Sequence, residues 1–202
     1  MTAIAALILA GGKGERLGGV NKALLTIGDT RFIDRAMAVT EGCAPKLLAV
    51  GRTGFEAPPE LIQIADLDTD YAGPLAGVAA AVEHLAGTTA EMLFSLAVDT
   101  PLFPRDFLTR ALPLLGTASA VLAAYGEQDY PTNALWRLDA LATLPHGIRT
   151  GTAPRSLKRL AEGLGAVRLD YAALSNFDPF RNANTPEDLA FLRAAAERGH
   201  GP

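Results

Sequence analysis

The feature that most constrains the fold is an apolar run near the N-terminus that leads directly into a glycine-rich segment. Residues Ile4–Leu9 are all apolar, which is typical of a strand buried on both faces of a parallel sheet. Glycines then cluster between Gly11 and Gly19. A second, largely apolar run at 92–98 ends at Asp99. We therefore expect a parallel sheet whose strands end in glycine-rich or acidic loops.

Strand-like and helix-like segments alternate along the rest of the chain. Pro74 suits the first turn of a helix, and Thr185 with Asp188 three residues later is a typical helix start. The alternation predicts a single-domain, Rossmann-like α/β fold with a mostly parallel sheet and helices on both faces. The expected strands are 4–9, 46–50, 61–65, 92–98, 118–125, 131–136 and 167–169, and the expected helices are 30–40, 74–85, 104–115, 138–144, 155–164 and one beginning at 186.

Composition narrows the class of protein. A length of 202 residues fits one domain, 1–202. The formal net charge is −4, which argues against a nucleic-acid partner because such proteins carry a basic face. Cys43 is the single cysteine, so neither an internal disulfide nor a Cys/His zinc site can form. The apolar N-terminal run is too short to span a membrane and lacks a basic start. We expect no membrane association and a cytoplasmic location.

The glycine-rich segment predicts a phosphate-binding loop. Glycine lets backbone amides approach phosphate oxygens closely, and Arg16 and Lys22 add cationic donors. A dinucleotide fingerprint beginning at Gly12 is excluded because its last glycine would fall on Leu17. A P-loop is excluded because no Gly-Lys-Ser/Thr run is present. The alternative is an ordinary surface loop.

Acidic residues follow two of the expected strands. In open α/β sheets ligands bind beyond the carboxyl ends of the strands, which is where Asp66 and Asp99 fall. Mg²⁺ prefers one or two protein carboxylates and takes its other ligands from phosphates and water. Asp99 is therefore the candidate metal ligand. The alternative is that Asp99 only caps the helix that follows it.

Four motifs together resemble a known family. The chain is similar to nucleotidyltransferases with the nucleotide-diphospho-sugar transferase fold, and most of all to molybdenum cofactor guanylyltransferases. The resemblance implies transfer of GMP from GTP to the molybdenum-carrying molybdopterin cofactor, with Mg²⁺ as cofactor and release of pyrophosphate. The motifs are Leu9-Ala10-Gly11-Gly12 with Arg16, Gly18 and Lys22; Gly73-Pro74-Leu75-Ala76-Gly77; Asp99-Thr100-Pro101; and Asn182-Ala183-Asn184-Thr185-Pro186.

The resemblance also implies that the two halves of the chain bind different substrates. Residues of about 1–103 would bind the nucleotide and those of about 104–198 the acceptor. Asn182 and Asn184 are two apart, so in an extended segment both amides face one ligand; alternatively, they only brace the loop. The implied catalytic residues are Arg16, Lys22 and Asp99, with Asp99 as metal ligand; the nucleotide-binding residues are Leu9, Ala10, Gly11, Gly12, Gly14, Lys22, Asp66 and Asp99; and the acceptor-binding residues are Gly19, Asn182 and Asn184.

Two departures and three alternatives stay open. The family commonly has Asp where this chain has Asn21, and Cys where it has Val98. A CTP-dependent cytidylyltransferase acting on the same pterin is one alternative, but such relatives tend to carry Leu-Ala-Ala-Gly, whereas Gly11 favours guanine. The others are a sugar-phosphate nucleotidylyltransferase and a non-catalytic nucleotide sensor. The resemblance is also compatible with protein partners that donate the cofactor or act as molybdoenzyme chaperones.

Overall fold

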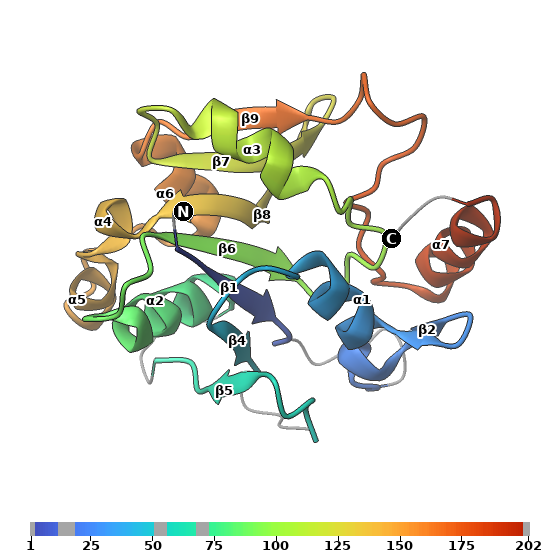
Figure 1. The fold of residues 1–202 in the computed structure, drawn as a ribbon, viewed down its shortest axis with the longest axis horizontal. Coiled ribbons are helices and arrows are strands. Elements are labelled where there is room, and N and C mark those ends of the chain that lie inside the picture. The colour runs from blue at the N-terminus through green and yellow to red at the C-terminus, as the bar shows by residue number, and fades with distance from the viewer. Residues whose placement is uncertain (1–2, 12–18, 51–55, 68–72, 200–202) are drawn as a thin grey trace.

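The computed structural model describes residues 3–11, 19–50, 56–67 and 73–199. Its centre is a seven-stranded sheet with the strand order β5-β4-β1-β6-β8-β7-β9 (Figure 1). Two further short strands, β2 and β3, form a separate antiparallel ribbon. The strands are β1 (Ile4–Leu9), β2 (Thr26–Ile27), β3 (Thr30–Arg31), β4 (Lys46–Ala49), β5 (Ile62–Ile64), β6 (Met92–Ala97), β7 (Ala120–Tyr125), β8 (Gln128–Arg137) and β9 (Val167–Asp170).

The large sheet is mostly parallel, as predicted. Strand β1 lies parallel to β4 on one side and to β6 on the other. The exception is β8, which runs antiparallel to both β6 and β7. It can do so because β7 and β8 form a hairpin, whose turn contains Gly126 with a φ of 56°. The sheet therefore reverses direction beside β6, the strand that leads to Asp99.

Helices cover both faces of the sheet, again as predicted (Figure 1). Alternate residues of β1 enter opposite layers: Ile8 packs in the layer that includes α1, α3 and α7, and Leu7 in the layer that includes α2, α5 and α6. Continuous apolar strands are required because each strand has no solvent face. The helices are α1 (Phe32–Val39), α2 (Pro74–Leu85), α3 (Phe107–Leu115), α4 (Leu138–Leu141), α5 (Leu144–Arg149), α6 (Leu157–Gly163), α7 (Pro186–Glu197) and the 3-10 helix η2 (Lys22–Leu24).

Several expected boundaries were wrong. The strand expected at 131–136 spans Gln128–Arg137, and the helix expected at 155–164 spans Leu157–Gly163. Helix α3 begins at Phe107 rather than at Pro104, and Asp106 is its N-cap residue. Helix α1 begins at Phe32 because the two preceding residues pair with β2. The expected helix at 138–144 is two helices, since α5 starts separately at Leu144 with a proline in its first turn. The ribbon β2–β3 and η2 were not predicted.

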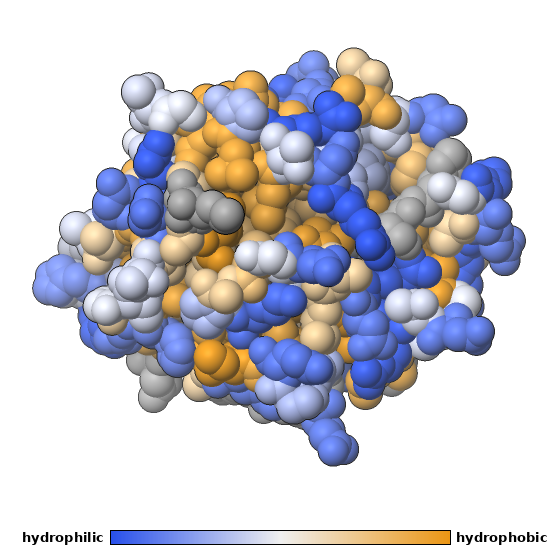
Figure 2. All heavy atoms as spheres, in the orientation of Figure 1, coloured by the Kyte–Doolittle hydropathy of each residue, from blue (hydrophilic) through white to orange (hydrophobic). Residues whose placement is uncertain are grey.

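The surface is largely hydrophilic. Figure 2 shows apolar side chains gathered on part of the face that carries α1 and α3, with hydrophilic side chains around them. Leu112 and Leu114 of α3 are among the exposed large apolar residues. Within the described ranges, the chain has no helix that is both long and apolar enough to cross a bilayer.

Candidate functional site

A small pocket lies at the carboxyl edge of the sheet, where β1 and β6 end. Its volume is about 120 Å³, below the range of about 300–1,000 Å³ that encloses a whole ligand. The described residues therefore enclose only part of a ligand of ordinary size. The pocket is lined by Leu9, Ala10, Gly11, Lys22, Pro74, Ala97, Val98, Asp99, Thr132 and Asn182.

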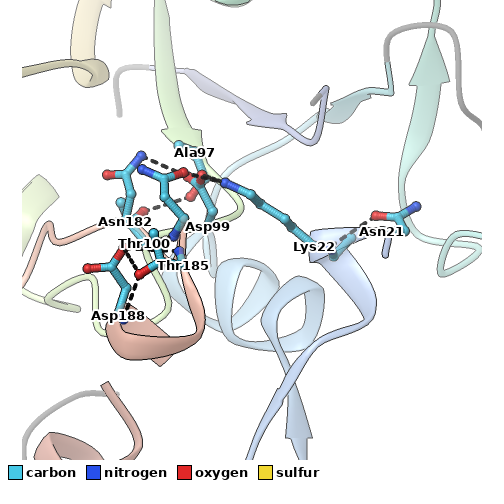
Figure 3. Close-up of polar contacts among 10 residues, drawn as sticks. Asn21, Lys22, Ala97, Asp99, Thr100, Asn182, Thr185 and Asp188 are labelled. Carbon is cyan, nitrogen blue, oxygen red and sulfur yellow. Dashed lines mark hydrogen bonds and ion pairs between the residues drawn. The ribbon is translucent and has the colours of Figure 1, made fainter. Parts of the chain in front are cut away.

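Lys22 is the centre of the polar contacts in this pocket. Its ammonium group donates to Oδ2 of Asp99 at 2.7 Å (Figure 3) and to Oδ1 of Asn184 at 2.5 Å. The side chains of Lys22 and Asp99 are each 16% exposed, so the pair is mostly shielded from water but still accessible. Three of the residues implied by the resemblance thus meet at one point.

Asn182 approaches the same aspartate from the other side. Its Nδ2 donates to Oδ1 of Asp99 at 3.1 Å (Figure 3), and the backbone N–H of Ala183 donates to the carbonyl oxygen of Asp99 at 2.8 Å. The Asn182–Asn184 loop is therefore attached to the end of β6 by both side chain and main chain. Asp99 is not the cap of α3, because that cap is Asp106.

Aromatic packing fixes the segment that leads to this loop. Phe180 is completely buried, and its ring lies 5.1 Å from Tyr171 and 5.3 Å from Phe103 between centroids. The hydroxyl of Tyr130 also donates to Asp178. Burial and this hydrogen bond raise the pKa of Tyr130. The neutral phenol is therefore the form that holds the segment.

The start of α7 fixes the other end of the loop. Oδ2 of Asp188 accepts hydrogen bonds from the backbone N–H groups of Asn184 and Thr185. The Thr185 hydroxyl in turn accepts from the backbone N–H of Asp188, which completes the predicted capping box. Asn184 is thereby held at a helix end while its side chain reaches Lys22.

The element that carries Lys22 explains the departure at Asn21. The Oδ1 of Asn21 accepts from the backbone N–H of Ala23 at 3.0 Å and caps η2. An aspartate makes the same cap, so the substitution preserves the local structure around Lys22. The second departure, Val98, is buried and fills a packing position.

Asp66 lies beside the pocket rather than in its lining. A Cβ built on Gly77 would be 2.9 Å from Cδ2 of Leu9 and 3.4 Å from Oδ1 of Asp66, so only glycine lets α2 approach this closely. Burial raises the pKa of Asp66. The half-buried carboxylate therefore lies close to the strand end that forms the pocket wall.

The remaining site candidates divide into two groups. Gly12, Gly14 and Arg16 lie outside the described residues. Gly19 is exposed in a turn with a φ of 76°, and it does not line the pocket. Sequence reasoning missed Thr132, which lines the pocket from β8, because a residue within an ordinary strand pattern gives no signal of its own.

The donor set is compatible with Mg²⁺. Throughout the described ranges, no three His, Cys, Asp or Glu residues gather as a metal site. Mg²⁺ needs only one or two protein carboxylates when phosphates and water complete its shell. The carboxylate of Asp99 and the amide oxygen of Asn184 already share one cation, the Lys22 ammonium. Oxygen donors arranged around a positive charge are the chemistry that a hard divalent cation requires.

Comparison with known proteins gives the class of enzyme that has this sheet and this polar carboxyl edge, the nucleotidyltransferases. Residues 6–166 match the family described as MobA-like NTP transferase domain, and the chain belongs to this family. The molybdenum cofactor guanylyltransferase of Acidiphilium cryptum is 38% identical over 196 residues, covering 96% of this chain and 94% of the relative. The enzyme of the same name from Rhodobacter capsulatus is 38% identical over 198 residues, covering 93% of each chain.

Solved structures agree on the fold. The molybdopterin-guanine dinucleotide biosynthesis protein A of Archaeoglobus fulgidus matches with a TM-score of 0.69 at 22% identity, covering 96% of this chain and 99% of that one. The 2-C-methyl-D-erythritol 4-phosphate cytidylyltransferase of Thermus thermophilus matches with a TM-score of 0.70 at 19% identity, covering 98% and 100%. At these identities the structures confirm the predicted fold and nothing about the substrate.

Proposed function

We propose that this protein transfers GMP from GTP to the molybdenum-molybdopterin cofactor and releases pyrophosphate. The relatives named for this reaction align over more than nine-tenths of the chain. The observation that carries the proposal is the convergence of Lys22, Asp99, Asn182 and Asn184 at the carboxyl edge of the sheet. These residues come from three distant parts of the sequence and meet only in the fold.

The chemistry requires positioning and charge compensation rather than a covalent intermediate. A phosphate oxygen of the acceptor attacks the α-phosphorus of GTP in line, and pyrophosphate leaves. By resemblance, Gly11, Gly12 and Gly14 are assigned to phosphate binding, and Leu9 and Ala10 line the pocket. By resemblance, Lys22 is assigned to the transferring phosphoryl group and Arg16 to the leaving pyrophosphate. Asp66 is assigned to a contact with the bound nucleotide by resemblance.

The carboxylate of Asp99 would hold Mg²⁺. When bound, the metal ion compensates charge on the phosphate oxygens of donor and acceptor. Lys22 supplies a second positive charge whose position the chain fixes independently through η2. Preorganised charges of this kind cost no reorganisation during the reaction.

The acceptor is assigned to the second half of the chain, about 104–198, and GTP to about 1–103. Asn182 and Asn184 offer amide donors and acceptors together, which suits the mixed edge of a pterin and its phosphate. Gly19, whose positive φ other residues adopt only with strain, borders the acceptor from the nucleotide side. We place the reaction in the cytoplasm, with protein partners that supply the cofactor or receive the product.

Cytidylyl transfer from CTP to the same pterin is the second candidate, which the resemblance of the motifs leaves open. Gly11 favours guanine over cytosine by resemblance. Pyrophosphate release is measured with GTP, CTP, ATP and UTP, each with and without molybdopterin. The proposal predicts release with GTP only when the acceptor is present. Pyrophosphate release with CTP instead of GTP identifies a cytidylyltransferase. Release only when a sugar phosphate replaces molybdopterin identifies a sugar-phosphate nucleotidylyltransferase. Nucleotide binding without any release identifies a non-catalytic sensor.

A further inference from the structure

Strand β8 leaves the regular sheet beside the candidate site. Leu122 of β7 pairs with Ala134, but the next residue, Ala123, pairs with Tyr130. Residues 131–133 of β8 are therefore extra residues with no counterpart on β7. Such bulges redirect side chains and are over-represented beside active sites. Here the bulge lies where β8 stops pairing with β6, whose last pair is Ser95 with Ala134.

Asn133 replaces the strand pairing that the bulge removes. Its Oδ1 accepts from the backbone N–H of Ala97 at 2.8 Å, and this bond is buried. The N–H of the following residue, Val98, points the opposite way to the carbonyl oxygen of Leu9. Without the Asn133 oxygen, the Ala97 N–H would be buried on the β8 side with no strand carbonyl to receive it.

The side-chain amide of Asn133 is held in one orientation, which leaves its Nδ2 without a hydrogen bond to any part of the chain that the structure describes. Only Oδ1 can accept from a backbone N–H, so the amide cannot rotate by half a turn. Its Nδ2 is consequently buried without a hydrogen-bond partner among the described residues. An unpaired buried donor opposes folding. A polar side chain with one unsatisfied end is thus kept at a completely buried position, and its acceptor end touches the strand that leads to Asp99.

The contact controls a short turn with little freedom. The carbonyl oxygen of Ala97 accepts from the Thr100 hydroxyl at 2.6 Å, and the carbonyl oxygen of Asp99 accepts from Ala183. Asn133 fixes the remaining polar group of Ala97, two residues before Asp99. The Asp99 carboxylate therefore projects from a backbone that is held by both neighbouring strands, β1 through Leu9 and β8 through Asn133.

We propose that Asn133 is a positioning residue for Asp99: its buried amide oxygen fixes the end of β6 so that the Asp99 carboxylate faces the metal ion. The inference rests on the proposed role of Asp99 as an Mg²⁺ ligand. Residues that orient a metal ligand typically affect metal affinity or activity by about 10- to 100-fold when they are changed.

Four variants test this role. Asn133→Leu removes the acceptor at similar volume, and Asn133→Ala removes it with less bulk should the leucine variant not fold. Asn133→Asp keeps an oxygen acceptor in the same place. Ser95→Ala is the matched control, because Ser95 is an equally buried polar residue two positions before Ala97 in β6. Its hydroxyl accepts from Nε1 of Trp136 and donates to the carbonyl oxygen of Ala134.

The readout is the Mg²⁺ concentration that gives half of the rise in melting temperature at fixed GTP, without acceptor. We expect Asn133→Leu and Asn133→Ala to raise this half-maximal Mg²⁺ concentration about 10-fold or more. Asn133→Asp should keep a half-maximal concentration near that of wild type. Ser95→Ala should lower the melting temperature without changing the half-maximal Mg²⁺ concentration. If the leucine and alanine variants only melt earlier, or if the aspartate variant behaves like them, the inference is wrong. Asp99→Asn should abolish the Mg²⁺-dependent rise; if it does not, the proposed metal role of Asp99 itself fails.

Discussion

The ammonium group of Lys22 lies 2.7 Å from the carboxylate of Asp99, although 77 positions separate the two residues in the sequence. The same ammonium group contacts the Asn184 amide oxygen. A lysine and an aspartate that compensate each other's charge can stay ordered in a mostly water-shielded site. In the proposed mechanism, both groups exchange this contact for phosphate and metal when substrate binds.

Lys22→Ala should lower the turnover number far more than it lowers stability. Loss of one preorganised charge contact to the transition state costs about 10²- to 10³-fold in rate. The measurement is kcat for pyrophosphate release, with melting temperature alongside. Lys158→Ala, at an exposed position on α6, is the control and should retain full activity. A change confined to KM would mean that Lys22 binds ground state and transition state equally.

Asp66→Asn should stabilise the free protein at neutral pH while weakening GTP binding. Burial raises the folded-state pKa of Asp66 above its ordinary value of 3.8, so the unfolded chain loses this proton first as pH rises. Stability contributed by the protonated form is therefore complete below about pH 3.8 and is lost as pH rises through the folded-state pKa. Melting curves from pH 3 to 8 should show a smaller decline for Asp66→Asn than for wild type. If the stability of Asp66→Asn and wild type depends on pH equally, the predicted effect of burial is wrong. If the affinity for GTP is unchanged, the predicted role of Asp66 in nucleotide binding is wrong.

Asn184→Ala and Asn182→Ala should weaken use of the acceptor more than binding of GTP. Both amides face Asp99 and Lys22 rather than the protein core, so their removal leaves the packing nearly intact. The measurement compares KM for molybdopterin, the dissociation constant for GTP and the melting temperature. A variant that melts early and loses GTP binding in proportion would assign that asparagine a bracing role instead.

Thr185→Ala separates bracing from ligand contact. It removes the hydroxyl of the α7 capping box, and loss of such a cap costs about 1 kcal/mol. We expect a lower melting temperature with a modest effect on both substrates. A selective loss of acceptor use in Thr185→Ala, equal to that of Asn184→Ala, would show that loop order alone explains both.

Much of the fold follows from local patterns in the sequence. The apolar run of β1 and the proline at the start of α2 define their elements because strand burial and helix initiation have local causes. The boundaries that failed depend on tertiary partners instead. Thr30 and Arg31 form a strand only because β2 lies opposite them, and no periodicity within 30–40 reveals that partner.

Part of the candidate site was predictable because some of its residues belong to local sequence patterns. Strand ends that carry Asp99 or glycine are visible in the sequence, and the resemblance supplied Asn182 and Asn184. The bulge at 131–133 was not predicted, because it is defined by how β8 pairs with β6 and β7 in the folded sheet. Asn133 is recognised only through its bond to Ala97, which lies 36 positions away.

The proposed transfer of GMP to the pterin is tested most directly with GTP that carries ³²P at its α-phosphate, by measuring where the label goes. Purified protein is incubated with this GTP, Mg²⁺ and molybdenum-loaded molybdopterin, and the pterin product is separated. The account predicts that labelled GMP becomes attached to the pterin with an equal amount of pyrophosphate, and that Asp99→Asn forms no such product. Absence of label on the pterin with wild-type protein, while α-labelled CTP or a sugar phosphate gives a labelled product, would contradict it.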